Sequence, residues 1–474
     1  MEWLEKYWYY PIIALIFFTG VLLTIKLRAI QFRKSGKSLK LMIKDTSQGN
    51  GEVSTFGALC ISLSATIGTG NIIGVASALA IGGAGALFWM IIVSILGLST
   101  KYAEGFLAVK YRKVDDEGKI IGGPYAYIEY GLGNKWIPLA KLFAFFGAAA
   151  AILGIGTMTQ SNGISDSFVN LIGSGKTFTL FNSEISIVSI IIGIIITILV
   201  TLVLIGGIKR ISKVCEYIVP IMAVLYVLIC LIILILNIKD LPFAVKEIFR
   251  LAFNTKAAAG GVMGYVITKA ITSGVSKGIF ANEAGLGSTP IALATAKNND
   301  PVKQGLISMG GMIVTIIICT MTGLVVTMTN AYSQGLEGID ITLFAFKNGL
   351  GFNMTISSIL LLLCIVFFAF TTIIGWNLYG MKCIAYLTNN NKIASKIYLV
   401  LYIIMVFVGS FLRVGVIWTV ADIANSLMAI PNLIALIMLS NKVKKDTLAY
   451  DFKAMKQTED NDNIKNEKLK EGLQ

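Results

Sequence analysis

Long apolar runs separated by short polar loops dominate the pattern of this chain. Many of these runs reach the ~20 residues that an α-helix needs to cross a bilayer. The pattern therefore predicts an all-α polytopic membrane protein. We predict eleven spans, at residues 9–27, 56–82, 85–109, 137–163, 185–206, 213–237, 258–280, 304–330, 355–387, 394–412 and 414–440.

Basic residues gather in alternate loops, and this sets the predicted orientation. The connection at 28–55 carries six Lys or Arg residues, and short loops rich in these residues face the cytoplasm. We expect residues 1–55 to form an extra N-terminal transmembrane helix with this cytoplasmic connection, and 441–474 to form a charged cytoplasmic tail. The N-terminus is then outside the cell and the C-terminus is in the cytoplasm. The chain is rich in Ile, Lys and Asn, which suggests an AT-rich prokaryote, and we expect the protein to lie in its cell membrane.

The second predicted span is interrupted at mid-depth by residues 64–71, which read SATIGTGN. A broken helix leaves N–H and C=O groups that hydrocarbon tolerates only beside a cavity or a bound polar group. Interrupted helices of this kind mark the substrate and ion sites of secondary transporters. The segment predicts both the class of the protein and the place where it acts.

The ten spans after the first divide into two groups of five, which form a predicted transporter core at 56–440. Each group, 56–237 and 258–440, opens with a span rich in glycine and hydroxyl residues, and the two openers are expected to run in opposite directions. This is the arrangement of an inverted five-plus-five repeat. We expect the binding site at mid-membrane between the two openers, both of them broken.

Composition argues against several other classes of protein. Of 474 residues 55% are hydrophobic and 14% are charged, against roughly 25% charged residues in soluble domains. The net charge of +14 lies largely in loops beside spans, so it does not indicate nucleic-acid binding. The sequence has no histidine, no HExxH motif and no CxxC pair. We therefore expect no enzyme activity, no cofactor and no obligate protein partner, only membrane lipid around the chain.

Four segments carry a resemblance to a known family: SATIGTGNIIG at 64–74, GPYAYI at 123–128, KGIFANEAGLGSTPIA at 277–292, and DIAN with MAIPN within 422–432. Along essentially the whole chain the sequence resembles the alanine or glycine:cation symporters, the sodium:alanine symporter group. The resemblance implies a LeuT-type fold. It also implies sodium-coupled import of alanine, and of glycine, by alternating access.

The break in the first opener is the predicted substrate site. Free N–H groups at the start of its second half-helix favour an anion, so we assign Thr69, Gly70 and Asn71 to the substrate carboxylate. Carbonyl groups near Ala65 and Thr66 are the expected acceptors for the substrate ammonium. The alternative is that the glycines only allow close helix packing.

Other residues are expected to complete the pocket. The resemblance places Gln160 there, although a cap at the outer water boundary is the alternative. Trp376 is expected to wall the pocket and limit side-chain length, with a place at a packing interface as the alternative. The second opener offers Thr268, Ile271 and Thr272 for the apolar and carbonyl wall.

Two adjacent threonines in the ninth span, together with the fold that the resemblance implies, indicate a sodium site between this span and the broken first opener. Thr371 and Thr372 would supply hydroxyl oxygens, and Ser64, Ile67 and Phe368 would supply carbonyl oxygens. Sodium, as a hard cation, suits neutral oxygen ligands of this kind. The alternative is that both threonines only bond back to carbonyls one turn earlier in their own helix.

Two charged residues leave alternatives open. Lys269 is costly at mid-span unless it is functional or reaches the interface, and it is the candidate for a proton-coupled transporter of the same fold. Glu283 is expected either to cap a helix or to gate the inner mouth by pairing with Lys277 or another basic residue. An ion channel is a weaker alternative, because channels of this size usually build a pore by oligomeric symmetry.

Overall fold

The computed structural model describes residues 9–43, 49–115, 117–180, 183–253, 262–351, 354–411 and 414–452. These residues are helical except for loops and two small antiparallel hairpins. The hairpins pair β1 (Lys113–Val114) with β2 (Ile120–Ile121) and β3 (Thr177–Leu180) with β4 (Ser183–Ser186). The predicted all-helical class is therefore confirmed.

The N-terminal region holds two helices where one was predicted. α2 (Tyr9–Lys26) matches the first predicted span, and α3 (Ile30–Ile43) follows after a bend of 85°. α3 packs against α15 (Pro301–Met328), and the Ser38 hydroxyl donates to the Leu306 carbonyl at 2.5 Å. The predicted basic connection therefore contains a helix that is docked on the core.

The first opener is broken as predicted. α4 (Thr55–Thr66) is followed by η1 (Gly70–Gly74) and α5 (Val75–Gly82), with a bend of 49° between the two parts. The next helices are α6 (Gly85–Lys110), α7 (Pro124–Ala126), η2 (Tyr127–Gly131), η3 (Asn134–Trp136), α8 (Ile137–Leu153), α9 (Met158–Ile172), α10 (Ile187–Leu204), α11 (Gly207–Leu236) and α12 (Leu241–Phe253). The predicted span at 137–163 lies within one candidate span, Asn134–Ile172, in which residues 154–157 separate α8 from α9.

The second opener differs from its prediction. α13 (Val262–Asn282) runs without interruption, and the chain unwinds only at 283–288, before α14 (Thr289–Leu293). Glu283, Gly285 and Gly287 have φ values of 51°, 87° and 81° there. The helices after α15 are η5 (Ala331–Ser333), α16 (Ile339–Leu350), α17 (Met354–Leu387), α18 (Lys392–Gly409) and α19 (Val414–Ala449).

The C-terminal helix is longer than predicted. α19 continues to Ala449, so the first part of the tail predicted at 441–474 is helical. The Tyr102 and Thr447 hydroxyls lie 2.9 Å apart, which ties this extension to α6. The rest of the predicted tail, 453–474, lies outside the described residues.

Eight helices in the described ranges are long and apolar enough to cross a membrane, and there are ten if each bent pair counts as one span. The multi-span architecture is thus present, whereas the number eleven is not reached. α10 shows the expected lipid-facing surface, because Ile191, Ile194, Ile195 and Ile198 are exposed on it. Apolar side chains at such positions are stable in a bilayer and costly in water.

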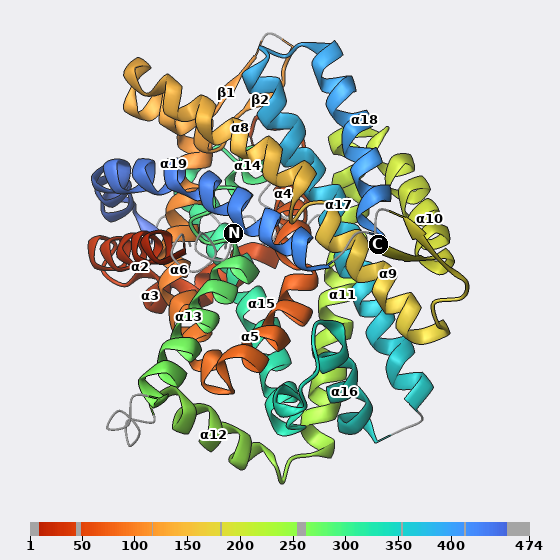
Figure 1. Ribbon diagram of the computed structural model, residues 1–474. Helices are drawn as coiled ribbons and strands as arrows, with labels where there is room; N and C mark the ends of the chain where they lie inside the picture. The colour runs from red at the N-terminus through yellow and green to blue at the C-terminus, as the bar shows by residue number, and fades with distance from the viewer. Residues whose placement is uncertain are drawn as a thin grey trace, which may run out of the picture.

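The loops divide between two ends of the helical bundle (Figure 1). α12 and α16 lie at one end, and the β1–β2 hairpin and the turn between α17 and α18 lie at the other. Which of these two ends faces the cytoplasm stays a prediction from the basic loops. Between the two ends, α6 packs along both α13 and α15 and forms much of the core beside the first break.

Candidate functional site

The break in the first opener is fully buried, and its backbone hydrogen bonds differ from those of a regular helix. The last bond of α4 runs from the Ile67 amide to the Leu63 carbonyl at 2.7 Å. The next amide, of Gly68, donates to the Asn71 Oδ1 atom at 3.0 Å instead of to the Ser64 carbonyl one turn back. The carbonyls of Ser64 and Ile67 thereby lose their usual helical partners and are open to other groups.

Four oxygen atoms meet beside this break. The Thr372 hydroxyl of α17 lies 2.8 Å from the Ser64 carbonyl oxygen, 3.3 Å from that of Ile67 and 2.8 Å from that of Phe368. One hydroxyl has one hydrogen and can donate fully to only one of the three. The Thr372 side chain is 0% exposed, so the remaining lone pairs face a site shielded from bulk water. Hard cations prefer such oxygen ligands.

Thr371, the adjacent residue, has a different environment. Its hydroxyl lies 2.9 Å from the Phe367 carbonyl, 3.1 Å from the Phe368 carbonyl and 3.4 Å from the sulfur of Met222. The first contact is the back-bond to the preceding turn that threonine forms in apolar helices. Of the five residues predicted for sodium, four contribute an atom to one cluster, and Thr371 approaches it only through the Phe368 carbonyl.

The amide groups of the break already have acceptors. The Thr69 amide donates to Gln160 Oε1 at 3.1 Å, and the Gly68 amide donates to Asn71 Oδ1. Asn71 Nδ2 in turn donates to the Ala281 carbonyl at 3.0 Å. The Thr69 hydroxyl is 0% exposed, and no hydrogen-bond partner for it exists in the described part of the chain. A buried hydroxyl without a partner is costly, so this atom is suited to a ligand at the break.

Gln160 reaches the break because α8 and α9 are separated by residues 154–157, which place it in the first turn of α9. Its Nε2 atom donates to the Ile155 carbonyl at 3.0 Å, and this fixes Oε1 toward Thr69. The Gln160 side chain thus lies at the break, and its place in a substrate pocket stays a prediction. The signal that could have revealed the interruption between α8 and α9 is the pair Gly154 and Gly156 in the middle of an apolar run.

The predicted residues of the second opener do not reach the break. Thr272 bonds back to the Thr268 carbonyl at 2.7 Å, and with Ile271 these residues are partly or fully exposed. The part of α13 that meets the break lies about two turns further on. A Cβ atom on Gly70 would lie 3.1 Å from the ring of Phe280, which marks that ring as the neighbour of the break.

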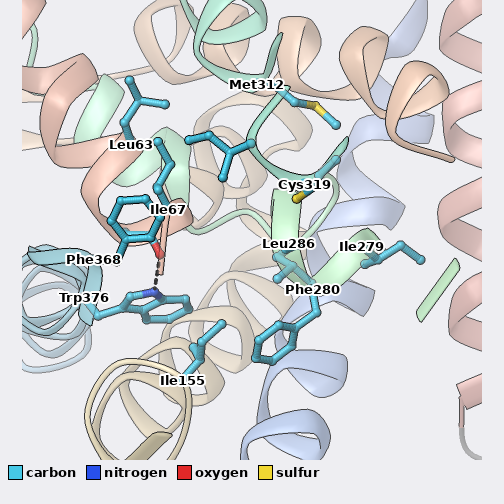
Figure 2. Close-up of a cluster of buried hydrophobic side chains, with 14 of the residues drawn as sticks. Leu63, Ile67, Ile155, Ile279, Phe280, Leu286, Met312, Cys319, Phe368 and Trp376 are labelled. Carbon is cyan, nitrogen blue, oxygen red and sulfur yellow. Dashed lines mark hydrogen bonds between the residues drawn. The ribbon is translucent and has the colours of Figure 1, made fainter. Parts of the chain in front are cut away.

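Trp376 lies against the break and forms a polar contact that the sequence does not reveal. Its indole N–H lies 3.3 Å from the Ala65 carbonyl and 3.2 Å from Glu283 Oε1. Figure 2 shows the indole beside Ile155, Ile67 and Phe368, with the dashed bond leading to the break. The side chain is 0% exposed, so it closes this side of the site.

A buried polar network surrounds the unwound segment after α13. Glu104 Oε1 accepts from the Gly287 amide at 3.1 Å and from Asn432 Nδ2 at 2.8 Å. The Lys101 ammonium donates to the Thr289 hydroxyl at 2.8 Å. Glu283 accepts hydrogen bonds from the Trp376 indole N–H and, at 2.5 Å, from the Ser288 hydroxyl. Lys101 carried no prediction, because one lysine near a span end resembles any interfacial lysine.

Two hollows approach the site from opposite ends of the bundle. A cavity of about 530 Å³ has Ile73, Gly74, Thr159 and Asn162 in its wall, which are neighbours of the break and of Gln160. The other, of about 780 Å³, is lined by residues of the hairpin end, among them Glu52 and Lys382. The first hollow lies on the predicted outer side and the second on the predicted inner side.

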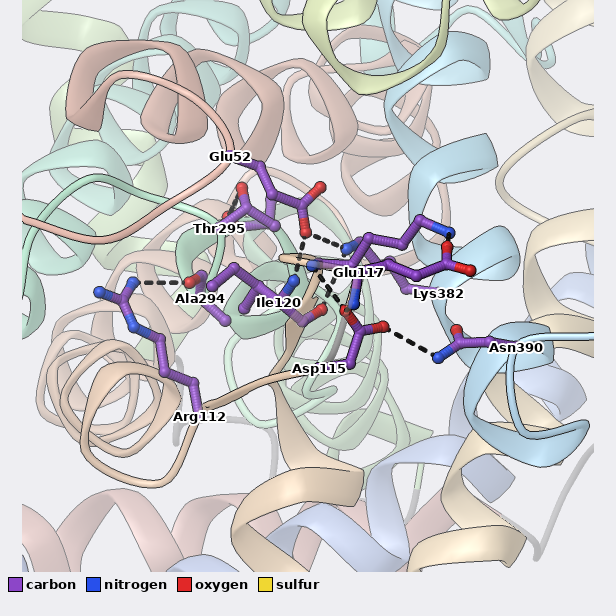
Figure 3. Close-up of polar contacts among 11 residues, drawn as sticks. Glu52, Arg112, Asp115, Glu117, Ile120, Ala294, Thr295, Lys382 and Asn390 are labelled. Atoms are coloured by element: carbon purple, nitrogen blue, oxygen red, sulfur yellow. Dashed lines mark hydrogen bonds and ion pairs between the residues drawn. The ribbon is translucent and has the colours of Figure 1, made fainter.

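Ionic contacts cross the second hollow. Glu52 Oε1 accepts from Lys382 of α17 and from the Ile120 amide of β2, and Lys382 also donates to the Ile120 carbonyl at 3.0 Å. Figure 3 shows these groups together with the contact between Asp115 and Asn390. The hairpin, the start of the first opener and the C-terminal half of α17 are therefore held together at this end of the bundle.

A match to the sodium:alanine symporter family extends over residues 1–466. The chain belongs to this family. It is 46% identical to an uncharacterized transporter of Haemophilus influenzae, over 94% of this chain and 93% of that protein. It is 40% identical to the sodium/alanine symporter AgcS of Methanococcus maripaludis, over 93% and 94%, and 35% identical to the probable sodium/glutamine symporter GlnT of Bacillus subtilis, over 92% and 87%.

Membership in the sodium:alanine symporter family makes this chain a multi-span membrane transporter of a cation-coupled amino acid transport family. The relatives' names include two amino acids of different length, alanine and glutamine. Membership therefore gives the class of transport, and the choice of substrate depends on the residues of the site.

Proposed function

We propose that this protein imports alanine, and also glycine, together with sodium by alternating access across a prokaryotic plasma membrane. The observation that carries the proposal is the meeting of the Ser64, Ile67 and Phe368 carbonyls with the Thr372 hydroxyl at the break. These neutral oxygens are the ligand set for a monovalent hard cation, with Thr371 as an outer contributor through the Phe368 carbonyl.

The substrate site is proposed directly beside the sodium site. The substrate carboxylate would take the unpartnered Thr69 hydroxyl and the amides of Thr69, Gly70 and Asn71, in exchange for Gln160 Oε1 at the Thr69 amide and the Gly68 carbonyl at the Asn71 amide. The helix dipole of the second half-helix favours a negative charge there. Thr268, Ile271 and Thr272 are not part of this proposal, because they lie away from the break.

The ammonium and side-chain ends of the substrate face Ala65 and Trp376 in this proposal. The Ala65 carbonyl is the acceptor for the ammonium, and the buried indole of Trp376 limits the length of the side chain. A methyl group fits this limit, whereas the longer side chain of glutamine does not. According to this proposal, the limited space beside Trp376 is what prevents this chain from carrying glutamine.

Alternating access would connect the two hollows to the break in turn. We propose that 56–237 and 258–440 form the two inverted repeats of a LeuT-type core, with the N-terminus outside and the C-terminus in the cytoplasm. Sodium bound between α4 and α17 would fix these helices relative to each other and favour the state that accepts substrate. The coupling of sodium binding to alanine binding is then a free-energy linkage between the two adjacent sites.

The test is uptake of labelled alanine into proteoliposomes that contain the purified protein. One set has an inward sodium gradient, and the other has a proton gradient without sodium. Accumulation driven only by sodium, and lost in Thr372→Ala, supports the proposal. Uptake driven by protons alone would reject sodium coupling, and competition by excess glutamine as strong as by alanine would reject the proposed size limit.

A proton-coupled transporter of the same fold is the second candidate, and a specific observation favours it. The buried network contains two carboxylates, Glu104 and Glu283, and one ammonium, Lys101. A buried excess of negative charge is costly and is relieved by binding a proton. Lys269, the earlier candidate, is only partly buried, so this network replaces it as the group to substitute if protons alone drive uptake.

A further inference from the structure

The indole of Trp376 has one hydrogen and two acceptors within reach. The Ala65 carbonyl lies at 3.3 Å and the Glu283 carboxylate at 3.2 Å from the same nitrogen. An indole N–H makes one strong bond, so the two oxygens compete for it. An ionised carboxylate is the stronger acceptor because charge-assisted bonds are shorter and stronger than neutral ones.

Glu283 is fixed by more than the tryptophan. The Ser288 hydroxyl donates to its second oxygen at 2.5 Å, so each carboxylate oxygen has one donor. Its backbone has a φ of 51°, a conformation that glycine adopts more readily than glutamate. The carboxyl group is 1% exposed. A glutamate in a backbone conformation suited to glycine, with both oxygens bonded, indicates that the side chain has a task at this position.

We propose that Glu283 is a positioning residue for the substrate's ammonium group. Its carboxylate draws the Trp376 N–H away from the Ala65 carbonyl and so leaves that carbonyl open to the substrate. The inference rests on the proposed function, which assigns the ammonium to Ala65. It adds a second role for Trp376, which then sets the availability of a backbone acceptor as well as the length of the side chain.

The first experiment is Glu283→Gln in the sodium-driven alanine uptake assay. The neutral amide oxygen is a weaker acceptor, so the indole shifts to Ala65 and competes with the substrate. We expect KM for alanine to rise about tenfold, the difference between a charged and a neutral hydrogen bond. The maximal rate and the half-saturating sodium concentration should change less than about twofold. Glu283→Asp, which keeps the charge, should recover part of the affinity.

The decisive comparison repeats Glu283→Gln in the Trp376→Phe background. Phenylalanine has no N–H, so Glu283 has nothing to draw away from Ala65, and E283Q should then change KM by less than about twofold. Non-additivity of this kind is the sign of a direct coupling. An equal rise of KM in both backgrounds would overturn the proposal, and so would a fall in maximal rate with KM unchanged.

The matched control is Glu129→Gln. Glu129 also accepts a hydrogen bond from an aromatic side chain, the Tyr386 hydroxyl at 2.5 Å. It lines the second hollow, however, which is the one beside the β1–β2 hairpin and away from the break. We expect KM for alanine to stay within about twofold of the wild type in E129Q. A rise as large as in E283Q would mean that any lost carboxylate weakens binding, and it would reject the specific role of Glu283.

A second measurement separates this proposal from the proposed function. In protein labelled with 5-fluorotryptophan, the Trp376 resonance is assigned by its loss in W376F. E283Q should shift this fluorine resonance and E129Q should not. If the wild type takes up no alanine, the proposed function fails. The shift of the Trp376 fluorine resonance in E283Q then still tests whether Glu283 contacts Trp376. An unmoved resonance in E283Q overturns the contact and the proposal with it.

Discussion

The Thr372 hydroxyl lies 2.8 Å from the Ser64 carbonyl, although the two residues are 308 positions apart in the sequence. This contact joins the middle of α17 to the last turn of α4, where the first opener unwinds. A threonine hydroxyl in an apolar helix normally serves its own preceding turn. Here the hydroxyl lies within hydrogen-bond distance of the Phe368 carbonyl in its own preceding turn and of the Ser64 carbonyl at the break. A single side chain therefore links the two elements of the proposed sodium site.

Thr372→Ala should weaken sodium binding much more than Thr371→Ala. Removing a hydroxyl ligand of a cation costs about 1.5–3 kcal/mol, so we expect the half-saturating sodium concentration in T372A to rise about 10- to 100-fold. T371A should change it less than about threefold, because that hydroxyl mainly bonds its own helix. Sodium-dependent uptake in proteoliposomes measures both. Equal losses in the two variants would reject Thr372 as the main hydroxyl ligand, and Thr372→Ser should keep most of the affinity.

Gly68→Ala should abolish transport while Gly74→Ala leaves it nearly intact. A Cβ atom on Gly68 would lie 2.7 Å from the Thr372 hydroxyl and 3.1 Å from Gln160 Oε1, whereas one on Gly74 meets nothing within 4 Å. The first substitution therefore displaces groups of both proposed sites. We expect at least about a hundredfold loss of alanine uptake in G68A, corresponding to about 3 kcal/mol. Similar activity of both variants would show that the break tolerates a side chain and would contradict this geometry.

Sodium should stabilise the detergent-solubilised protein, and potassium should not. A ligand that binds only the folded state adds RT ln(1 + [L]/Kd), about 2.7 kcal/mol at about 100 times Kd. The apparent melting temperature should therefore rise with sodium chloride relative to equal potassium chloride. The difference should vanish in T372A and persist in T371A. A rise that is the same for both salts would indicate general screening of charges and no specific site.

Glu52→Gln should loosen the end of the bundle that holds the β1–β2 hairpin. The Glu52 and Lys382 side chains are 12% and 14% exposed and pair directly, and losing such a pair near the surface costs about 1 kcal/mol. The adjacent buried thiol of Cys383 reports on opening. In a variant with Cys383 as the only cysteine, we expect E52Q to speed maleimide labelling about fivefold. Glu117→Gln, which breaks an exposed pair with Lys119, is the control and should leave the rate unchanged.

The position of the second break shows how glycine can mislead a reading of the sequence. The second opener is rich in glycine, and we expected it to unwind within 258–280. In the structure a Cβ atom on Gly274 would lie 2.2 Å from the Ala86 carbonyl, and one on Gly278 would lie 3.0 Å from Met90. These glycines allow α13 to pack closely on α6. Small residues serve packing and unwinding alike, and the pattern alone does not separate the two.

The sequence by itself determined the membrane-spanning helical class, the break near Gly68 and the family, because hydropathy, helix length and long motifs are local properties of the chain. The grouping of Ser64, Ile67, Phe368 and Thr372 followed from the resemblance. Only the tertiary structure decided which threonine meets the break. It also showed that the Trp376 indole is shared by Ala65 and Glu283 and that the second break falls after Asn282. Each of these depends on how helices far apart in the sequence rotate and shift against one another, and a rotation of one residue, about 100°, replaces the side chain that faces the site.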